Sequence, residues 1–269
     1  IFGRDMLAEF DAIAPGWRAG AFATLPEMRA MLMFDRTDGV PTSFQELLDG
    51  QPPAGDVRHE SAARAGDPAI IMYTSGTTGS PKGALHTHDS LLRAAYCNAY
   101  HHAFEDGRRA IFSLPLYHTY GLVTGLLSGL VVGGSIAALP RFHAARMLAA
   151  VGGFEGTWLL AVPTMTVALL EEAEKGEYDL SSLRAIHSAA APTPSWVWQK
   201  IRQVFGVDEV FTSYGQTETS MVTCTRSDDA LATVSLTQGV LALAGAAGLV
   251  ERGGQIADVR IIDPESGEP

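Results

Sequence analysis

The feature that most constrains the fold is an alternation, from Ala69 onward, of short apolar runs with longer stretches of helical spacing. The short runs predict strands over residues 69–73, 110–114, 135–139, 157–161, 184–188 and 209–214. The longer stretches predict helices over residues 90–104, 121–132, 144–151, 163–175 and 194–205. This alternation predicts an α/β fold, with a mainly parallel sheet covered by helices on both faces. Residues 226–256 fit neither pattern and receive no assignment.

One uncharged stretch of twenty residues, 121–140, has the length of a membrane helix, and its glycines recur every fourth position. The Gly133-Gly134 pair interrupts it, and a short β-like run follows. It has neither aromatic belts nor a clustered basic flank. We therefore expect a closely packed buried helix followed by a buried strand, and no membrane span.

Composition excludes several classes of function. The chain has 269 residues, 46% of them hydrophobic and 18% charged, which is typical of a globular protein with a sizeable core. A formal net charge of −11 gives no support to nucleic-acid binding. Cys97 and Cys224 have neither metal-ligand spacing nor a disulfide framework, so we expect buried free thiols and a cytoplasmic location.

A string rich in glycine and hydroxyl side chains, YTSGTTGSPKG, follows the first predicted strand and spans Tyr73 to Gly83. Glycines let a backbone approach a ligand and turn its N–H groups inward, and hydroxyls add further donors. Lys82 supplies a positive charge. The string lacks the GxxxxGK[ST] spacing of the P-loop, so it predicts a phosphate-binding loop of another kind.

This string resembles the signature of the adenylate-forming superfamily, which includes acyl-CoA synthetases, aryl-CoA ligases, luciferases and the adenylation domains of peptide synthetases. In that family it is a mobile loop that holds the β- and γ-phosphates of ATP. The resemblance implies an ATP-binding role for Thr74, Ser75, Gly76, Thr77, Thr78, Gly79 and Lys82.

A second segment of the same resemblance is TSYGQTET, from Thr212 to Thr219. Tyr214 matches the tyrosine that lies against the adenine ring, and Gly215 and Gln216 belong to the same nucleotide site. Thr217 matches the threonine that bonds the α-phosphate. Glu218 matches the glutamate that ligates Mg²⁺, and a carboxylate oxygen suits that hard cation.

Two further segments complete the resemblance. Ser188-Ala189-Ala190-Ala191-Pro192 matches a small-residue wall of the adenine slot, with Ala189 in place of the usual glycine. The segment Leu114 to Gly121 contains His118, which matches the histidine at the junction of the carboxylate and thiol tunnels. Adenylation domains for α-amino acids carry an Asp near this position, so His118 favours a simple carboxylic acid.

The resemblance implies two sets of site residues. Catalytic roles fall to His118, Thr217, Glu218 and Lys82. The acid pocket is expected to include His118, Tyr120, Gly121, Val162, Met165, Ser188 and Met221. The apolar members of the second set suggest that the acid carries a hydrophobic chain or ring.

The implied activity is that of an AMP-forming acyl-CoA ligase. A carboxylate attacks the α-phosphorus of ATP with Mg²⁺ present, pyrophosphate leaves, and coenzyme A then displaces AMP. Two alternatives stay open: an enzyme that loads a carrier protein, and a nucleotide-binding fragment without turnover of its own.

The resemblance also implies a division of the chain. We expect residues 1–269 to be a fragment of the large N-terminal domain, lacking the C-terminal lid and its second catalytic lysine. Within it, residues 1–60 would be the irregular end of one subdomain, and 61–269 the nucleotide- and acid-binding core.

Overall fold

The structure is a computed structural model that describes residues 11–12, 15, 63–74, 80–104 and 107–268. The chain divides into two units, Ile1–Ala62 and Ala63–Pro269. Only the second unit is described in detail. The expectations for residues 1–60 therefore lie outside the described residues, apart from three isolated positions.

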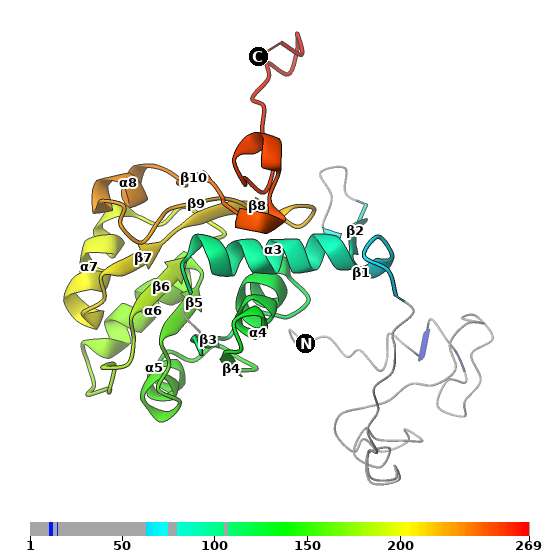
Figure 1. Cartoon of the computed structure of the whole chain (residues 1–269). Coiled ribbons are helices and arrows are strands. Elements are labelled where there is room, and N and C mark those ends of the chain that lie inside the picture. Colours follow the sequence, from blue (N-terminus) through cyan, green and yellow to red (C-terminus); the bar gives the residue numbers. More distant parts are fainter. Residues whose placement is uncertain (1–10, 13–14, 16–62, 75–79, 105–106, 269) are drawn as a thin grey trace. The chain divides into compact units, whose positions relative to one another are not determined.

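The centre of the second unit is a five-stranded parallel sheet with the order β4-β3-β5-β6-β7 (Figure 1). Its strands are β3 (Arg109–Phe112), β4 (Ser135–Ala138), β5 (Trp158–Ala161), β6 (Ala185–Ser188) and β7 (Glu209–Phe211). Every neighbouring pair is parallel. Because parallel strands point the same way, the loops that follow them gather at one edge, where ligands of such sheets bind.

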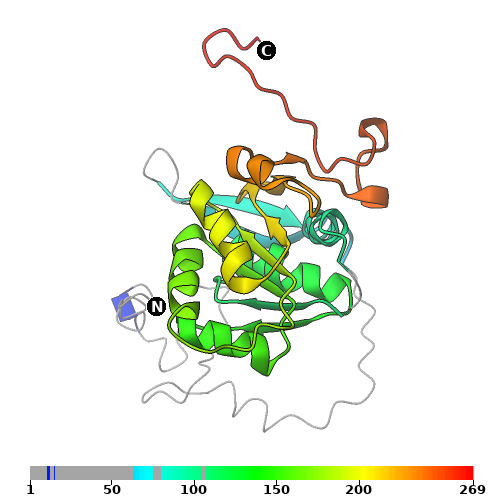
Figure 2. The ribbon, with the colours of Figure 1, turned by 90° about the vertical axis from the view of Figure 1, so that its left-hand side faces the viewer.

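Successive residues of each strand face opposite sides of this sheet, and both sides are buried. On one side lie Ile111, Leu159 and Ile186, packed against α5 (Ala144–Gly153), α6 (Pro163–Ala173) and α7 (Ser195–Phe205). The other side is covered by α3 (His88–His101), by residues of η2 (Tyr120–Leu127) and by β9 (Ser220–Cys224) (Figure 2). The expected α/β architecture, with helices on both faces of a parallel sheet, is thus confirmed.

The helix ends follow local sequence signals. Thr87 caps α3 by accepting a hydrogen bond from the backbone of Ser90, whose side chain accepts one in return from Thr87. Pro163 stands in the first turn of α6, where its missing N–H costs nothing. Gly206 ends α7 in the left-handed conformation, with φ of 67°. The predicted helices over 144–151, 163–175 and 194–205 match α5, α6 and α7 closely.

The apolar stretch 121–140 folds as η2, a π-helix, continued by α4 (Ser128–Val131) and followed by strand β4. Glycines allow close packing here: a Cβ at Gly125 would lie 2.7 Å from the ring of Phe112. The expected helix followed by a strand is confirmed, but β4 is the edge strand and only half-buried rather than buried. Across the described residues, no helix combines the length and apolarity needed to cross a membrane.

Two of the predicted strands differ from the expectation of one mainly parallel sheet. Residues 69–73 lie in β1 (Pro68–Thr74), which pairs with β2 (Lys82–Thr87) in an antiparallel hairpin outside the parallel sheet. The run 209–214 is two strands, because Thr212 separates β7 from β8 (Ser213–Gln216).

The second of these strands starts another sheet. β8 pairs with β9, and β9 pairs with the short β10 (Val240–Leu241), both antiparallel. Residues 226–256 contain β10, α8 (Leu231–Leu236) and two short 3₁₀ turns, η3 (Gly245–Ala247) and η4 (Val250–Arg252).

Candidate active site

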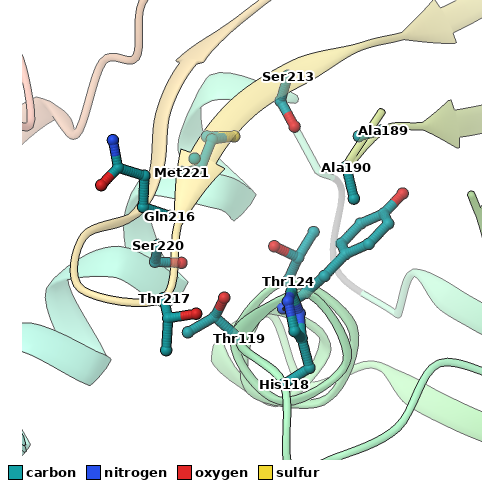
Figure 3. Close-up of a pocket in the computed structure, with 12 residues that line it drawn as sticks. His118, Thr119, Thr124, Ala189, Ala190, Ser213, Gln216, Thr217, Ser220 and Met221 are labelled. Atoms are coloured by element: carbon teal, nitrogen blue, oxygen red, sulfur yellow. The ribbon is translucent and has the colours of Figure 1, made fainter. Parts of the chain in front are cut away.

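A pocket lies where the segments that follow β3, β6 and β7 meet (Figure 3). It is formed by the start of η2, the turn after β6 and the hairpin of β8 and β9. Its lining residues are His118, Thr119, Tyr120, Thr124, Ala189, Ala190, Ser213, Gly215, Gln216, Thr217, Ser220 and Met221. The pocket therefore lies at the edge of the sheet where the parallel strands end, which is the edge where ligands of such sheets bind.

His118 lines the pocket as a neutral imidazole with a defined tautomer. The backbone N–H of Tyr120 donates to Nδ1 of His118 over 3.1 Å, so Nδ1 is the unprotonated nitrogen and Nε2 carries the proton. Partial burial lowers the pKa of His118 from its ordinary value of 6.5. At neutral pH this histidine can therefore donate a hydrogen bond from Nε2, but it carries no charge.

Tyr120 connects the pocket to the sheet. Its hydroxyl lies 2.8 Å from the carbonyl oxygen of His187 and 3.2 Å from that of Ala161, and its single proton is shared between these two acceptors. These carbonyls belong to the ends of β6 and β5, so the tyrosine holds the start of η2 against both strands. Burial raises the pKa of Tyr120 well above 10, which keeps the hydroxyl a donor. Its ring lines the pocket, while its hydroxyl is already engaged.

The small-residue turn after β6 contributes Ala189 and Ala190. Ala190 adopts the left-handed conformation with φ of 72°, which is uncommon for a residue with a Cβ. Behind the turn, Ser188 is fully buried, and its Oγ bonds the hydroxyls of Thr166 and Thr193 at 2.9 and 3.2 Å. Ser188 therefore supports the turn and does not line the pocket.

The turn between β8 and β9 carries Thr217 and the exposed Glu218. Gly215 is required nearby because a Cβ there would lie 2.1 Å from the carbonyl oxygen of Ser220 on the paired strand. His86, from β2, donates from Nε2 to the carbonyl oxygen of Thr217 over 2.7 Å. The hairpin that contains Lys82 is thereby bonded to the turn that contains Glu218.

Several predicted site residues lie away from the lining of this pocket. Tyr214 is 46% exposed on β8, where its hydroxyl bonds the amide of Gln216. Thr74 and Lys82 face each other across the β1–β2 pairing. Among the expected acid-pocket residues, His118, Tyr120 and Met221 line the pocket, and those that do not are Gly121, Val162, Met165 and Ser188. Ala191 and Pro192 are exposed beyond the turn. Outside the described residues lie Ser75, Gly76, Thr77, Thr78 and Gly79.

Sequence reasoning did not single out four hydroxyl residues of the lining, which are Thr119, Thr124, Ser213 and Ser220. Figure 3 shows Thr217 and Ser220 on the hairpin facing Thr119 and Thr124 across the pocket. Within the described part of the chain, the buried Oγ of Ser220 has no hydrogen-bond partner. Thr119 and Ser213 lie inside the recognised strings, whereas Thr124 and Ser220 follow those strings by three residues and one residue, and this proximity was the available signal. The pocket is consequently more polar than the apolar candidates suggested.

The residues present fit a magnesium ion brought by a nucleotide. Mg²⁺ is usually bound through one or two carboxylates together with substrate phosphates and water. Glu218 supplies one exposed carboxylate on the turn of the β8–β9 hairpin; it follows the lining residue Thr217 in sequence but is not itself part of the lining. This donor set suits a hard cation that arrives with phosphate oxygens.

Comparison with known proteins shows which family the chain belongs to. Residues 20–269 match the family model described as AMP-binding enzyme. The 4-coumarate–CoA ligase-like 8 protein of Arabidopsis thaliana is 29% identical over 253 residues, which are 93% of this chain and 43% of that protein. The chain thus spans less than half the length of this relative.

Solved structures are also similar to this chain. The ATP-bound MatB from Rhodopseudomonas palustris has a TM-score of 0.73 and 27% identity, covering 97% of this chain and 50% of that one. A malonyl-CoA ligase with methylmalonyl-CoA and AMP bound has a TM-score of 0.62 and 33% identity, over 68% of this chain and 40% of that one. The chain belongs to the AMP-binding enzyme family.

Proposed function

We propose that the protein activates a carboxylic acid with ATP, forming an acyl-adenylate and pyrophosphate, and that coenzyme A then accepts the acyl group. The first step joins two anions, so it depends on positioning and on neutralising charge more than on acid–base chemistry. Such a reaction requires hydrogen-bond donors that orient the two anions and a carboxylate that binds the metal ion, all near one pocket.

The observation that carries the proposal is the meeting of three sequence segments at one sheet edge. His118, Ala189 and Thr217 come from positions spread over about a hundred residues, yet all three line the same pocket. Each belongs to a different string of the family resemblance. Each string follows a strand of the parallel sheet, so the topology places all three at the edge where ligands of such sheets bind.

Within this proposal each side chain has a defined task. His118 donates from Nε2 to the acid carboxylate and orients it, since a neutral imidazole places no second positive charge in the pocket. The Thr217 hydroxyl bonds the α-phosphate. Lys82 and the glycine-rich string bind the outer phosphates, and Glu218 holds Mg²⁺.

When bound, the ion neutralises phosphate charge during attack. The carboxylate oxygen forms a bond to the α-phosphorus, and the bond from that phosphorus to the bridging oxygen of pyrophosphate breaks. The pyrophosphate leaves with the electron pair, so no proton transfer is needed in this step.

The two buried free thiols, Cys97 and Cys224, support our placing of the reaction in a reducing compartment such as the cytoplasm. Coenzyme A is favoured as acceptor because the similar proteins are CoA ligases. Among the described residues, no observation favours a carrier protein.

A panel of carboxylic acids assayed for ATP-dependent pyrophosphate release, with and without coenzyme A, tests the proposal. We expect release with a subset of acids, and acyl-CoA formation when coenzyme A is added. Acid-independent ATP hydrolysis, or no pyrophosphate with any acid although ATP binds, would contradict it.

A further inference from the structure

Three side chains of metal-ligating type converge in the core behind the active-site pocket. His102 follows the end of α3, His187 lies in β6 and Cys224 ends β9. All three are buried, and one ligand atom of each lies within 4.8 Å of the other two. They are far apart in the sequence, so no spacing motif predicts this cluster.

Each imidazole has one nitrogen held by a partner outside this trio of side chains, and its other nitrogen has no hydrogen-bond partner outside the trio among the described residues. In His102, Nδ1 donates to the carbonyl oxygen of Asn98 over 2.6 Å, so Nε2 carries a lone pair. That Nε2 accepts a hydrogen bond from the Cys224 thiol over 3.2 Å, the bond that a metal ion would replace. In His187, Nε2 lies 2.9 Å from Oγ of Ser213.

The remaining nitrogen of His187, Nδ1, is buried and has no hydrogen-bond partner among the described residues. Such an orphaned buried group calls for an explanation, and an ion or ordered water is a common one. Metal-binding histidines usually have their second nitrogen fixed by a hydrogen bond, as both of these have.

From this geometry we propose that His102, His187 and Cys224 form a binding site for a thiophilic d¹⁰ metal ion, Zn²⁺ or Cu⁺. Two imidazole nitrogens and one thiolate suit these ions and exclude Mg²⁺ and Ca²⁺, which prefer oxygen. Metal–nitrogen and metal–sulfur bonds are about 2.0 and 2.3 Å long, so the two ligand atoms that lie farthest apart would have to approach each other by about 1 Å on binding.

Binding replaces the thiol proton with the metal. The S–H bond of Cys224 breaks, a metal–sulfur bond forms, and the proton leaves to solvent without any change of oxidation state. Cu⁺ would give a neutral centre and Zn²⁺ a centre with one positive charge. The site is independent of the proposed reaction, although Ser213 both lines the active-site pocket and bonds His187.

Cobalt substitution tests the site spectroscopically. The purified protein is stripped with a chelator and titrated with Co²⁺, whose bond to a thiolate produces a near-ultraviolet charge-transfer band. We expect the band at about one ion per chain, and its loss on adding Zn²⁺ or Cu⁺. Whichever competitor removes it at lower concentration identifies the preferred ion.

Matched variants separate this site from adventitious binding. Cys97 is also buried, but its thiol donates to the carbonyl of Leu243, so Cys97→Ser should keep the band. Cys224→Ser should lose it, and Zn²⁺ should raise the Tm of wild type but not of Cys224→Ser. Absence of the band in folded wild-type protein would overturn the proposal even if Cys224→Ser failed to fold. A band of equal strength in Cys224→Ser would overturn it as well.

Discussion

His86 and Thr217 are 131 positions apart in the sequence, yet Nε2 of His86 donates to the backbone carbonyl of Thr217 over 2.7 Å. His86 is only 4% exposed, so little water competes for this bond. The bond joins strand β2, which begins at Lys82, to the turn that holds Glu218. It therefore fixes the two charged parts of the candidate site relative to each other.

Replacing His86 should accordingly change the position of the turn more than the stability of the fold. We expect His86→Phe, which keeps the bulk and removes the donor, to lower kcat for pyrophosphate release by about tenfold, or about 1.4 kcal/mol. His86→Gln, which can still donate, should recover part of the loss. The exposed His88 provides the matched control, and His88→Phe should behave as wild type. Equal kcat in His86→Phe and wild type would show that the bond does not position the turn.

Much of the parallel sheet and its helices could be predicted because their signals are local. Apolar runs of strand length, Pro163 at a helix start and Gly206 at a helix end each act within a few residues. The β1–β2 and β8–β9 hairpins were assigned wrongly or missed, because an apolar strand gives no indication of its partner. The run from Glu209 to Tyr214 gives no sign that its two halves join different sheets.

The lining of the pocket was predictable where a residue lies inside a recognisable string or close to its end. His118, Ala190 and Thr217 were found in this way, and all three line the pocket. His86 and Ser220 act through contacts that depend on how distant segments pack. The same limit applies to Cys224, whose neighbours His102 and His187 are close in space but distant in sequence.

Removing the candidate metal carboxylate or the phosphate-loop cation should weaken adenylation. We expect Glu218→Ala and Lys82→Ala each to lower pyrophosphate release by at least about tenfold, or about 1.4 kcal/mol of transition-state stabilisation. Glu171 and Lys175 are exposed near the far end of α6, so Glu171→Ala and Lys175→Ala are the controls. Raising the Mg²⁺ concentration should partly restore Glu218→Ala and leave Lys82→Ala unchanged. Wild-type rates in both site variants would remove the basis of these assignments.

Buried histidines should make the protein sensitive to mild acid. The pKa of His187 falls to about 3 in the folded state, against 6.5 ordinarily, so the unfolded chain binds the extra proton between these values. The stabilisation is complete above pH 6.5 and is lost as the pH falls towards 3. At pH 5 the loss amounts to about 2 kcal/mol from His187, and His102 adds to it in the same direction.

Urea unfolding of the chelated protein at pH 7 and pH 5 would measure this loss. His187→Gln should reduce the dependence to the share that His102 contributes, whereas the exposed His88→Gln should leave it unchanged. A free energy of unfolding that is equal at the two pH values would contradict the expectation. Carboxylates contribute little here, since they titrate mainly below this range.

Ala190 offers a direct test of backbone strain at the pocket. A left-handed alanine costs about 1–2 kcal/mol, and glycine relieves this at an entropic cost of about 0.5–1 kcal/mol. Because Ala190 has φ of 72°, we expect Ala190→Gly to raise the free energy of unfolding by about 0.5–1 kcal/mol. The neighbouring exposed Ala191 has no positive φ, so Ala191→Gly should be neutral or destabilising. Destabilisation by Ala190→Gly would mean that the alanine methyl group makes a compensating contact.

The acid class follows from the charges around the pocket. An α-amino acid brings an ammonium group, and burying it requires a carboxylate or several acceptors. Among the described residues that line the pocket none is Asp or Glu, and His118 is held neutral with its Nε2 as a donor. The hydroxyls of Thr119, Thr124 and Ser220 can accept a hydrogen bond but cannot neutralise a cation.

We therefore expect an aryl or fatty carboxylic acid to be preferred over the amino acid of matching side chain by at least about a hundredfold in kcat/KM, or about 2.7 kcal/mol. Phenylpropanoate and phenylalanine competing in one pyrophosphate assay would measure the ratio. Phenyllactate is the matched control, because its α-hydroxyl has nearly the size of the ammonium group without the charge. If charge decides the ratio, phenyllactate should resemble phenylpropanoate; if size decides it, phenyllactate should be rejected as strongly as phenylalanine. Equal or better use of phenylalanine would indicate an amino-acid-activating enzyme instead.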